Sequence, residues 1–171
     1  MIKAFIIVAH TVDGFIAPES VQGQSVASTV WTSGADKKKF VELTKKAGVI
    51  VMGLNTYNTI GRALPNRLNV VYAPAGTPQI AGVEMTAKSP IDLLKDLEAR
   101  GFSEVAICGG STIYTMFMEA GLIDKIYITV EPHLFGRGLT IFNKPLDIKL
   151  SLVKSENLSS DVLFLEYKIG K

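Results

Sequence analysis

The chain has 171 residues, of which 47% are hydrophobic and 20% charged, a composition typical of one soluble globular domain spanning residues 1–171. The formal net charge of +2 is too small to predict binding to nucleic acid or to an anionic membrane surface. The single cysteine, Cys108, excludes an internal disulfide framework, and with His10 and His133 it shows no metal-ligand spacing. The N-terminal apolar run is too short for a signal or membrane-spanning segment, so we expect a cytoplasmic protein.

Short apolar runs predict buried strands, and amphipathic or capped segments between them predict helices. The strands are expected at residues 4–9, 49–52, 68–72, 105–108 and 126–130. The helices are expected at residues 33–47, 54–60, 89–101 and 109–120. Strands that alternate with helices in this way predict an α/β fold with a largely parallel sheet covered on both faces.

Two regions depart from this alternation. Apolar residues at 150–154 and 162–167 flank a polar turn at 157–161, which predicts an antiparallel hairpin at one edge of the sheet. Residues 10–30 form the longest stretch expected to be irregular and are rich in Ser, Gln, Gly and Val. A stretch of that length inside a compact domain is more often functional than idle.

Two glycine-containing turns connect a buried strand to a helix. They are "VMGLNTYNTIG" at residues 51–61 and "ICGGSTIY" at residues 107–114. Glycine lets a ligand approach the backbone closely, and a helix N-terminus offers free N–H groups and the positive end of its dipole. Two such turns at strand ends favour a dinucleotide bound across a crevice. Neither turn has the spacing of an ordinary Rossmann or Walker motif.

The segment "WTSGADKKKF" at residues 31–40 raises a question about Asp36. Ser33 resembles a helix N-cap, and an acid three residues later is typical of a capping box. Asp36 also shares one side of the predicted helix with Phe40 and Leu43, which favours a partly buried carboxylate with a chemical role. The residues themselves leave both interpretations open.

Five motifs follow one another along most of the chain. They are "VDGFIA" at residues 12–17, W-x-x-x-A-D-x-x-x-F-x-x-x-T at 31–44, VMG-x-x-T-Y-x-x-I-G-R-x-L-P-x-R-x-N at 51–69, GG-S-x-I-Y at 109–114 and G-x-T-x-F at 138–142. In this order they resemble the dihydrofolate reductase superfamily, which includes the pyrimidine reductases of riboflavin biosynthesis. The resemblance implies a mixed, mostly parallel sheet flanked by helices, with a C-terminal antiparallel hairpin.

The resemblance also implies an activity, the NADPH-dependent reduction of 7,8-dihydrofolate to tetrahydrofolate in one-carbon metabolism. Catalytic roles carry over to Asp36 as the acid, to Trp31 as the holder of an active-site water, and to Tyr114 beside the nicotinamide. A cis peptide bond is implied between Gly109 and Gly110.

Binding residues carry over in the same way. The substrate-binding residues are expected to be Ile7, Asp36, Phe40, Ile60, Leu64, Arg67, Cys108 and Thr129. The cofactor-binding residues are expected to be Ala9, Ile16, Gly53, Leu54, Asn55, Thr56, Gly109, Gly110, Ser111, Thr112, Ile113 and Tyr114. Arg67 matches the arginine that clamps the glutamate carboxylate of folate, a task that suits a bidentate guanidinium. No metal is expected, and the protein is expected to be a monomer or a homodimer.

Several positions depart from the family pattern. Leu54 and Thr112 stand where basic residues bind the 2′-phosphate of NADPH in many members, so NADH is a possible cofactor, and Lys88 is the first residue to examine for a phosphate contact. Leu139 replaces an aspartate that pairs with the active-site loop in some members. The long segment 17–31 is similar to that of the pyrimidine reductases, which leaves a riboflavin-pathway pyrimidine reductase as an alternative. A non-catalytic nucleotide-binding module is a further alternative.

Overall fold

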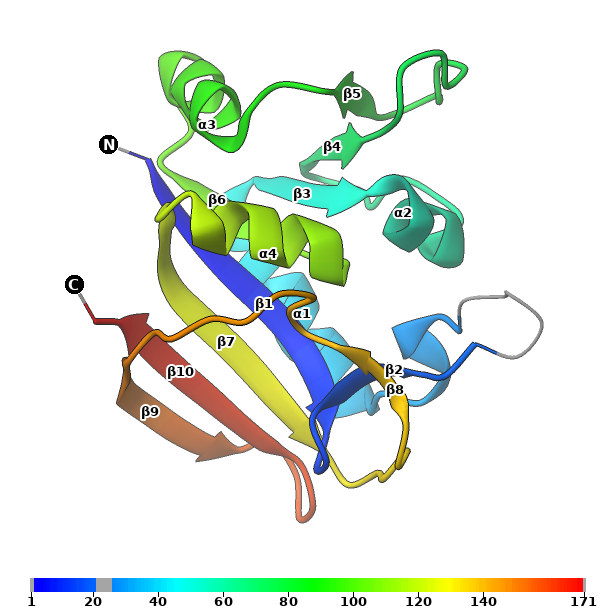
Figure 1. Cartoon of the computed structure of the whole chain (residues 1–171), viewed down its shortest axis with the longest axis vertical. Helices are drawn as coiled ribbons and strands as arrows, with labels where there is room; N and C mark the ends of the chain where they lie inside the picture. Colours follow the sequence, from blue (N-terminus) through cyan, green and yellow to red (C-terminus); the bar gives the residue numbers. More distant parts are fainter. Residues whose placement is uncertain (1, 21–25, 171) are drawn as a thin grey trace.

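The centre of the molecule is a mixed sheet. The structure is a computed structural model that describes residues 2–20 and 26–170, and within them eight strands lie in the order β5-β4-β3-β6-β1-β7-β10-β9 (Figure 1). The strands are β1 (Lys3–Thr11), β3 (Val49–Gly53), β4 (Leu68–Tyr72), β5 (Glu84–Thr86), β6 (Glu104–Ile107), β7 (Ile123–Glu131), β9 (Leu150–Asn157) and β10 (Leu163–Ile169). Neighbouring strands from β5 to β7 are parallel, whereas β10 is antiparallel to β7 and β9. The predicted fold class and C-terminal hairpin are therefore confirmed.

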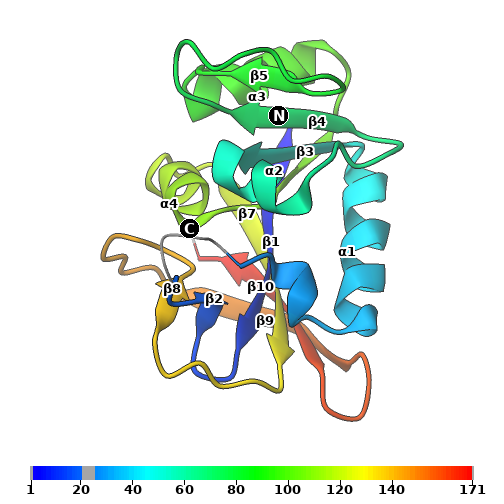
Figure 2. The ribbon, with the colours of Figure 1, turned by 90° about the vertical axis from the view of Figure 1, so that its right-hand side faces the viewer.

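The helices cover both faces of this sheet. They are α1 (Gly34–Ala47), α2 (Leu54–Ile60), α3 (Pro90–Ala99) and α4 (Ser111–Glu119), and a 3₁₀ turn, η1 (Ser28–Val30), precedes α1. Figure 2 shows α1 and α4 on opposite sides of the strands. No helix in the described part of the chain is both long and apolar enough to cross a membrane.

The burial of β1 shows why its sequence reads as a continuous apolar run. Side chains of a strand alternate between its two faces. Ala4, Ile6 and Val8 join the core cluster that includes residues of α3 and α4. Phe5 and Ile7 join the second cluster, which packs against α1 and α2. Because both faces are covered, every position of the run is apolar.

A small second sheet lies beside the carboxyl end of β1 (Figure 1). It pairs β2 (Phe15–Pro18) with β8 (Gly138–Thr140) in antiparallel fashion. The backbones approach closely there, since a Cβ built on Gly138 would clash with the carbonyl oxygen of Ala17. This sheet brings the segment after β1 against a segment about 120 residues later in the chain.

The expectation that residues 10–30 are irregular is therefore wrong in part. Residues 10 and 11 extend β1, residues 15–18 form β2, and residues 28–30 form η1, whereas residues 21–25 lie outside the described part. The predicted strands and helices are present, with ends shifted by a few residues. The sequence did not predict β2, β5 or β8, which have three or four residues each, and β2 and β8 also pair across about 120 residues of the chain.

Candidate active site

A cavity of about 790 Å³ opens at the carboxyl ends of β1, β3 and β6. Its volume lies in the range of sites for small molecules and cofactors. Most of the predicted binding residues line it, namely Ile7, Ala9, Ile16, Asp36, Phe40, Gly53, Leu54, Asn55, Thr56, Cys108, Gly109, Gly110, Ser111, Thr112, Ile113 and Tyr114. The structure thus brings residues from five separate segments of the sequence to one cavity.

The remaining predicted residues lie outside the cavity lining. They are Trp31, Ile60, Leu64, Arg67 and Thr129. Thr129 contributes indirectly, because its hydroxyl hydrogen-bonds to the Asp36 carboxylate. Ile60 and Leu64 pack against the core cluster beneath α1 and α2.

The structure resolves the two interpretations of Asp36. Ser33 is the N-cap of α1, and its Oγ accepts a hydrogen bond from the Asp36 backbone N at 3.1 Å. In a capping box, the Asp36 carboxylate would in turn accept the Ser33 N–H. That N–H instead donates to Oε1 of Glu131 at 2.9 Å. The capping-box interpretation is therefore wrong, and the half-buried Asp36 carboxylate faces the cavity.

Helix α3 offers an internal comparison, because it begins with the same Ser-x-x-Asp spacing. There the Ser89 Oγ accepts from Asp92 N at 3.2 Å and donates to Asp92 Oδ2 at 2.6 Å, so the acid remains at the helix end. At α1 the serine hydroxyl donates to Glu131 instead, at 2.8 Å. The difference between the two acids therefore originates outside the local sequence.

The surroundings of Asp36 favour its protonated form. Burial raises the pKa of this carboxyl, and the Thr129 hydroxyl opposes the rise by hydrogen bonding to the charged form. The negative charge of Glu131 raises the pKa further, whereas Thr32 and Lys37 lower it. A carboxyl with a raised pKa that lines a cavity is suited to donating a proton.

The turn between β6 and α4 forms one wall of the cavity. The Gly109–Gly110 peptide bond is cis, as the resemblance implies. Gly109 has a φ of +110°, and a Cβ there would lie 3.1 Å from the Tyr114 hydroxyl. That hydroxyl donates to the carbonyl oxygen of Ile7 at 2.9 Å, so Tyr114 connects α4 to β1 at the cavity. Burial raises its pKa, which keeps the phenol protonated.

Two helix N-termini point their backbone groups towards this wall. Gly110 caps α4 and Gly53 caps α2, and neither helix has a side-chain hydrogen bond at its cap. The Gly53 N–H donates to the carbonyl oxygen of Gly109 at 2.8 Å, which joins the two turns. A Cβ at Gly53 would lie 3.2 Å from Ile113, and one at Gly110 would lie 3.4 Å from Thr56. The close packing and uncapped N–H groups suit the phosphates of a dinucleotide.

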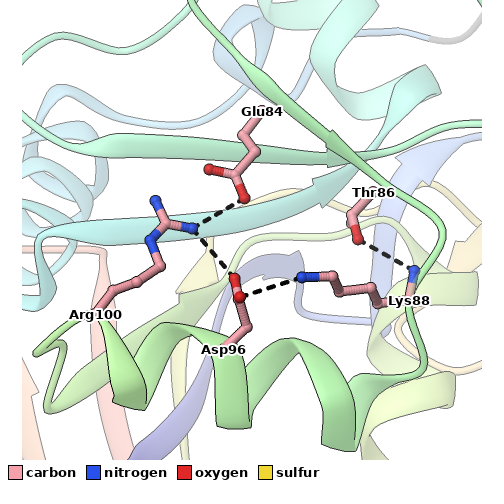
Figure 3. Close-up of polar contacts among 5 residues, drawn as sticks. All are labelled: Glu84, Thr86, Lys88, Asp96 and Arg100. Atoms are coloured by element: carbon pink, nitrogen blue, oxygen red, sulfur yellow. Dashed lines mark hydrogen bonds and ion pairs between the residues drawn. The ribbon is translucent and has the colours of Figure 1, made fainter.

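The charges around the cavity bear on which dinucleotide could bind. Among its described lining residues, Glu19 and Asp36 are charged, and none is Lys, Arg or His. Lys88 forms an ion pair with Asp96 at 3.2 Å, and Arg100 contacts the same carboxylate at 3.3 Å (Figure 3). Lys88 is therefore paired with a carboxylate of α3 and does not line the cavity.

Arg67 does not line the cavity, and its guanidinium is held by two hydrogen bonds. Its Nε donates to the carbonyl oxygen of Pro65 at 3.1 Å, and its Nη1 donates to Thr44 Oγ1 on α1. Burial lowers the pKa of the guanidinium, and the buried thiol of Cys108 is its electrostatic neighbour. Two contacts leave other guanidinium N–H groups available, since Arg carries five donors.

Trp31 packs against the β7–β8 connection and is not itself among the residues that line the cavity. Its ring meets those of Phe135 and His133 edge-to-face, with centroids 5.2 and 6.1 Å apart. Its Nε1 is buried and finds no hydrogen-bond partner among the described residues.

The β7–β8 connection is also hydrogen-bonded to the segment after β1. Leu139, which stands where some family members have an aspartate for this contact, has no polar side chain to make it. The Asp13 carboxylate accepts backbone N–H groups from Gly136 at 2.7 Å and Phe135 at 3.1 Å. The Thr11 hydroxyl is the largest of the hydrogen-bond effects that lower the Asp13 pKa. The aspartate that joins the two segments is therefore Asp13, on the segment after β1, and it does not lie at position 139 on β8.

Sequence reasoning missed part of the lining. The missed residues are Val8, Ala17, Pro18, Glu19, Ser20, Val26, Ser28, Thr59, Tyr72, Pro74, Gly138, Leu139 and Asn143. Several lie on β2 or β8, where two of the recognised motifs mark the segments but do not show which of their residues reach the cavity. Glu131 was also missed, although an acid that ends an apolar strand was a usable signal.

Comparison with known proteins agrees with this geometry. The family model described as dihydrofolate reductase matches residues 5–163. The chain is 31% identical to the dihydrofolate reductase of Bacillus subtilis over 134 residues, which cover 77% of this chain and 74% of that enzyme. It is 35% identical to a type 3 dihydrofolate reductase of Salmonella typhimurium over 101 residues, covering 58% of this chain and 57% of that one.

Solved structures share the fold over nearly the whole chain. A putative riboflavin biosynthesis protein from Shewanella sp. PV-4 superposes with a TM-score of 0.79 at 22% identity, covering 99% of this chain and 100% of that one. A bifunctional pyrimidine deaminase and uracil reductase from Thermotoga maritima gives 0.78 at 18% identity, covering 99% of this chain and 57% of that one.

The fold and the cavity are those of an α/β reductase domain with a site for a nucleotide cofactor. The chain belongs to the dihydrofolate reductase family, a family of oxidoreductases. Several matches span about 60% of the length of the curated relatives.

Proposed function

We propose that the protein is an NADPH-dependent reductase that transfers a hydride to 7,8-dihydrofolate and forms tetrahydrofolate. The observation that carries this proposal is Asp36, a half-buried carboxyl that lines the cavity although it begins a helix. A carboxylate at this place can accept hydrogen bonds from the 2-amino group and a ring N–H of a pterin together. Its raised pKa favours a proton on the same group, as reduction of the ring requires.

The cofactor would bind along the wall formed by Gly53–Thr56 and Gly109–Thr112. When bound, the reduced nicotinamide supplies the hydride. A side chain at Gly53 or Gly109 would crowd Ile113 or Tyr114, and the bare glycine backbone of both turns suits close approach of a ligand. Ala9 and Ile16 line the same cavity and would contact the nicotinamide end.

We further propose that NADH can replace NADPH in this protein. A 2′-phosphate is normally bound by Lys or Arg, and the described lining offers neither. We also propose a cytoplasmic location, which the single cysteine suggests, and a monomer or a homodimer.

Arg67 supports folate as the substrate. Its tethers to Pro65 and Thr44 hold the guanidinium beside α1, which also carries Asp36 and Phe40. From there its remaining donors could bind the glutamate carboxylate of a folate.

A reductase of the riboflavin-pathway pyrimidine is the second candidate. Its support is the fold shared over 99% of the chain with a putative riboflavin biosynthesis protein. The absence of Lys and Arg from the described cavity lining weighs against it, because such a substrate carries a phosphate.

Oxidation of NADPH should be measured with dihydrofolate and, in parallel, with the aminouracil substrate of the pyrimidine reductases. Turnover of dihydrofolate that is lost in Asp36→Asn would support the proposal. Turnover of the aminouracil alone would replace it with the second candidate. Binding of NADPH without turnover of either substrate would favour a non-catalytic nucleotide-binding module.

A further inference from the structure

Glu131 is a buried acid that the proposed chemistry does not use. It is the last residue of β7 and only 1% exposed. Burying a carboxylate is costly unless hydrogen bonds compensate for the lost water. Its Oε1 accepts from both the backbone N and the Oγ of Ser33, at 2.9 and 2.8 Å. The acid is therefore held at the N-terminus of α1, where the helix dipole favours a negative charge.

The contact with Ser33 determines what Asp36 can do. Ser33 is extended, with φ −70° and ψ 162°, and caps α1 by accepting the Asp36 backbone N–H. The Ser33 N–H is the donor that the Asp36 carboxylate would take in a capping box. Because Glu131 on β7 accepts the Ser33 N–H, this donor is not available to the Asp36 carboxylate. The Asp36 side chain is therefore released from the helix end.

Strand β7, which carries Glu131, also contacts the Asp36 carboxylate itself. Thr129 and Glu131 are two residues apart on β7, and side chains at that spacing share one face of a strand. Both are buried, at 2% and 1% exposure. Thr129 hydrogen-bonds to the Asp36 carboxylate and Glu131 to its cap, so one face of β7 fixes the first turn of α1 at two points.

Three ionisable groups on three elements face Asp36. Glu131 faces it from β7, Lys37 lies beside it on α1, and Tyr114 lies across the cavity on α4. Thr129 and Thr32 add neutral hydroxyls. The charge of Glu131 raises the pKa of Asp36, whereas that of Lys37 lowers it. Since Tyr114 stays protonated, Glu131 is the anion that opposes ionisation of Asp36.

We propose that Glu131 is a positioning residue of the active site, which binds the N–H and hydroxyl of the N-cap residue Ser33 and thereby frees and aims Asp36 at the substrate. The part of this role that concerns catalysis rests on the proposed function. The placement of Asp36 itself can be tested without any substrate.

The first experiment follows the Asp36 carboxyl by ¹³C NMR titration of the full-length protein, with the signal assigned through Asp36→Asn. Glu131→Gln keeps the shape and an acceptor for Ser33 but removes the charge. We expect Asp36 to titrate at lower pH in this variant, and the Ser33 amide to exchange faster with solvent. Glu166→Gln is the matched control, because Glu166 lies on β10 and pairs with Lys125 at 2.6 Å. It should leave both signals unchanged.

The second experiment measures turnover and cofactor affinity. Glu131→Gln should lower turnover of dihydrofolate roughly tenfold at neutral pH and move the acidic limb of its pH profile in the direction of the NMR shift. The dissociation constant of NADPH should not change, since Glu131 does not line the cavity. Glu131→Asp keeps the charge with a shorter reach, so it should preserve more of the Asp36 shift than the Gln variant.

An Asp36 titration that is identical in wild type and Glu131→Gln would overturn the proposal. If the wild type reduces no dihydrofolate, the proposed function fails, and the NMR titration still decides whether Glu131 controls Asp36.

Discussion

Replacing Asp36 with Asn separates the chemical role of this residue from its structural one. The amide keeps an oxygen that can accept from Thr129, and the Ser33 cap is untouched because it uses the Asp36 backbone. The variant loses the ionisable group. General acid–base catalysis contributes about 10²–10⁴ to rate. We therefore expect turnover to fall at least about a hundredfold, which is about 2.7 kcal/mol of transition-state stabilisation.

The effect on stability should have the opposite sign. Burial is the largest cause of the raised Asp36 pKa, so the folded state binds this proton more tightly than the unfolded state. The carboxyl then costs no stability at pH below its ordinary value of 3.8, and the free energy of unfolding declines as pH rises through the raised folded value. Asn has no such cost. The variant should melt at an equal or higher temperature than the wild type at neutral pH.

The assay is steady-state oxidation of NADPH with dihydrofolate, together with thermal melts across pH. Asp92→Asn is the matched control, because Asp92 holds the same position after its cap on α3 and is bonded to Ser89. It should leave turnover unchanged. Near-normal turnover of Asp36→Asn with a lower melting temperature would refute the reasoning and show that the Asp36 carboxyl contributes to stability and not to the chemistry.

Four further predictions concern the rest of the site. Arg67→Ala should weaken dihydrofolate binding by about 1.5–3 kcal/mol, or roughly tenfold to a hundredfold, yet spare a dihydropterin without glutamate; an equal effect on both Michaelis constants would exclude the clamp. Gly110→Val should abolish NADPH binding in a fluorescence titration while the melt shows a folded protein. The preference for NADPH over NADH should stay below about a thousandfold, roughly 4 kcal/mol. Lys88→Ala should not alter the ratio of the dissociation constants of NADPH and NADH. A change in this ratio would show that Lys88 leaves its ion pair to bind the cofactor. Tyr72→Phe should raise the free energy of unfolding by about 1–3 kcal/mol in denaturant melts. The reason is that the buried hydroxyl of Tyr72, whose pKa burial raises to about 12, has no partner among the described residues. A loss of stability would mean that this hydroxyl is bonded in solution.

The sheet and its helices could be predicted from the sequence because their signals are local. The apolar run of β1, the Ser-Pro start of α3 and the glycines before α4 each specify an element within a few residues. The strands β2 and β8 gave no such signal, since their short pairing depends on contact across about 120 residues.

The contrast between local signals and contacts of distant segments also explains which features of the site could be predicted. The glycine turns and Asp36 were recognisable as motifs, and the structure places them in one cavity. The choice between the two roles of Asp36 was not available locally, because Ser-x-x-Asp begins both α1 and α3. It depends on Glu131, 98 residues beyond Ser33 in the chain.

The small β2–β8 sheet bears on how fast ligands could enter and leave. Its residues Ala17 and Gly138 line the cavity, so the mouth is built partly from strands of three and four residues. The β2–β8 pairing is short, and the neighbouring hydrogen bond from Gly136 to Asp13 is exposed. This pairing therefore opens at a lower free-energy cost than the buried strand β1. For the proposed reductase, we therefore predict that product release proceeds by local separation of these two strands, while α1 with Asp36 and β7 with Thr129 stay in place. In such an enzyme, the rate of release and the rate of chemistry would depend on different parts of the fold.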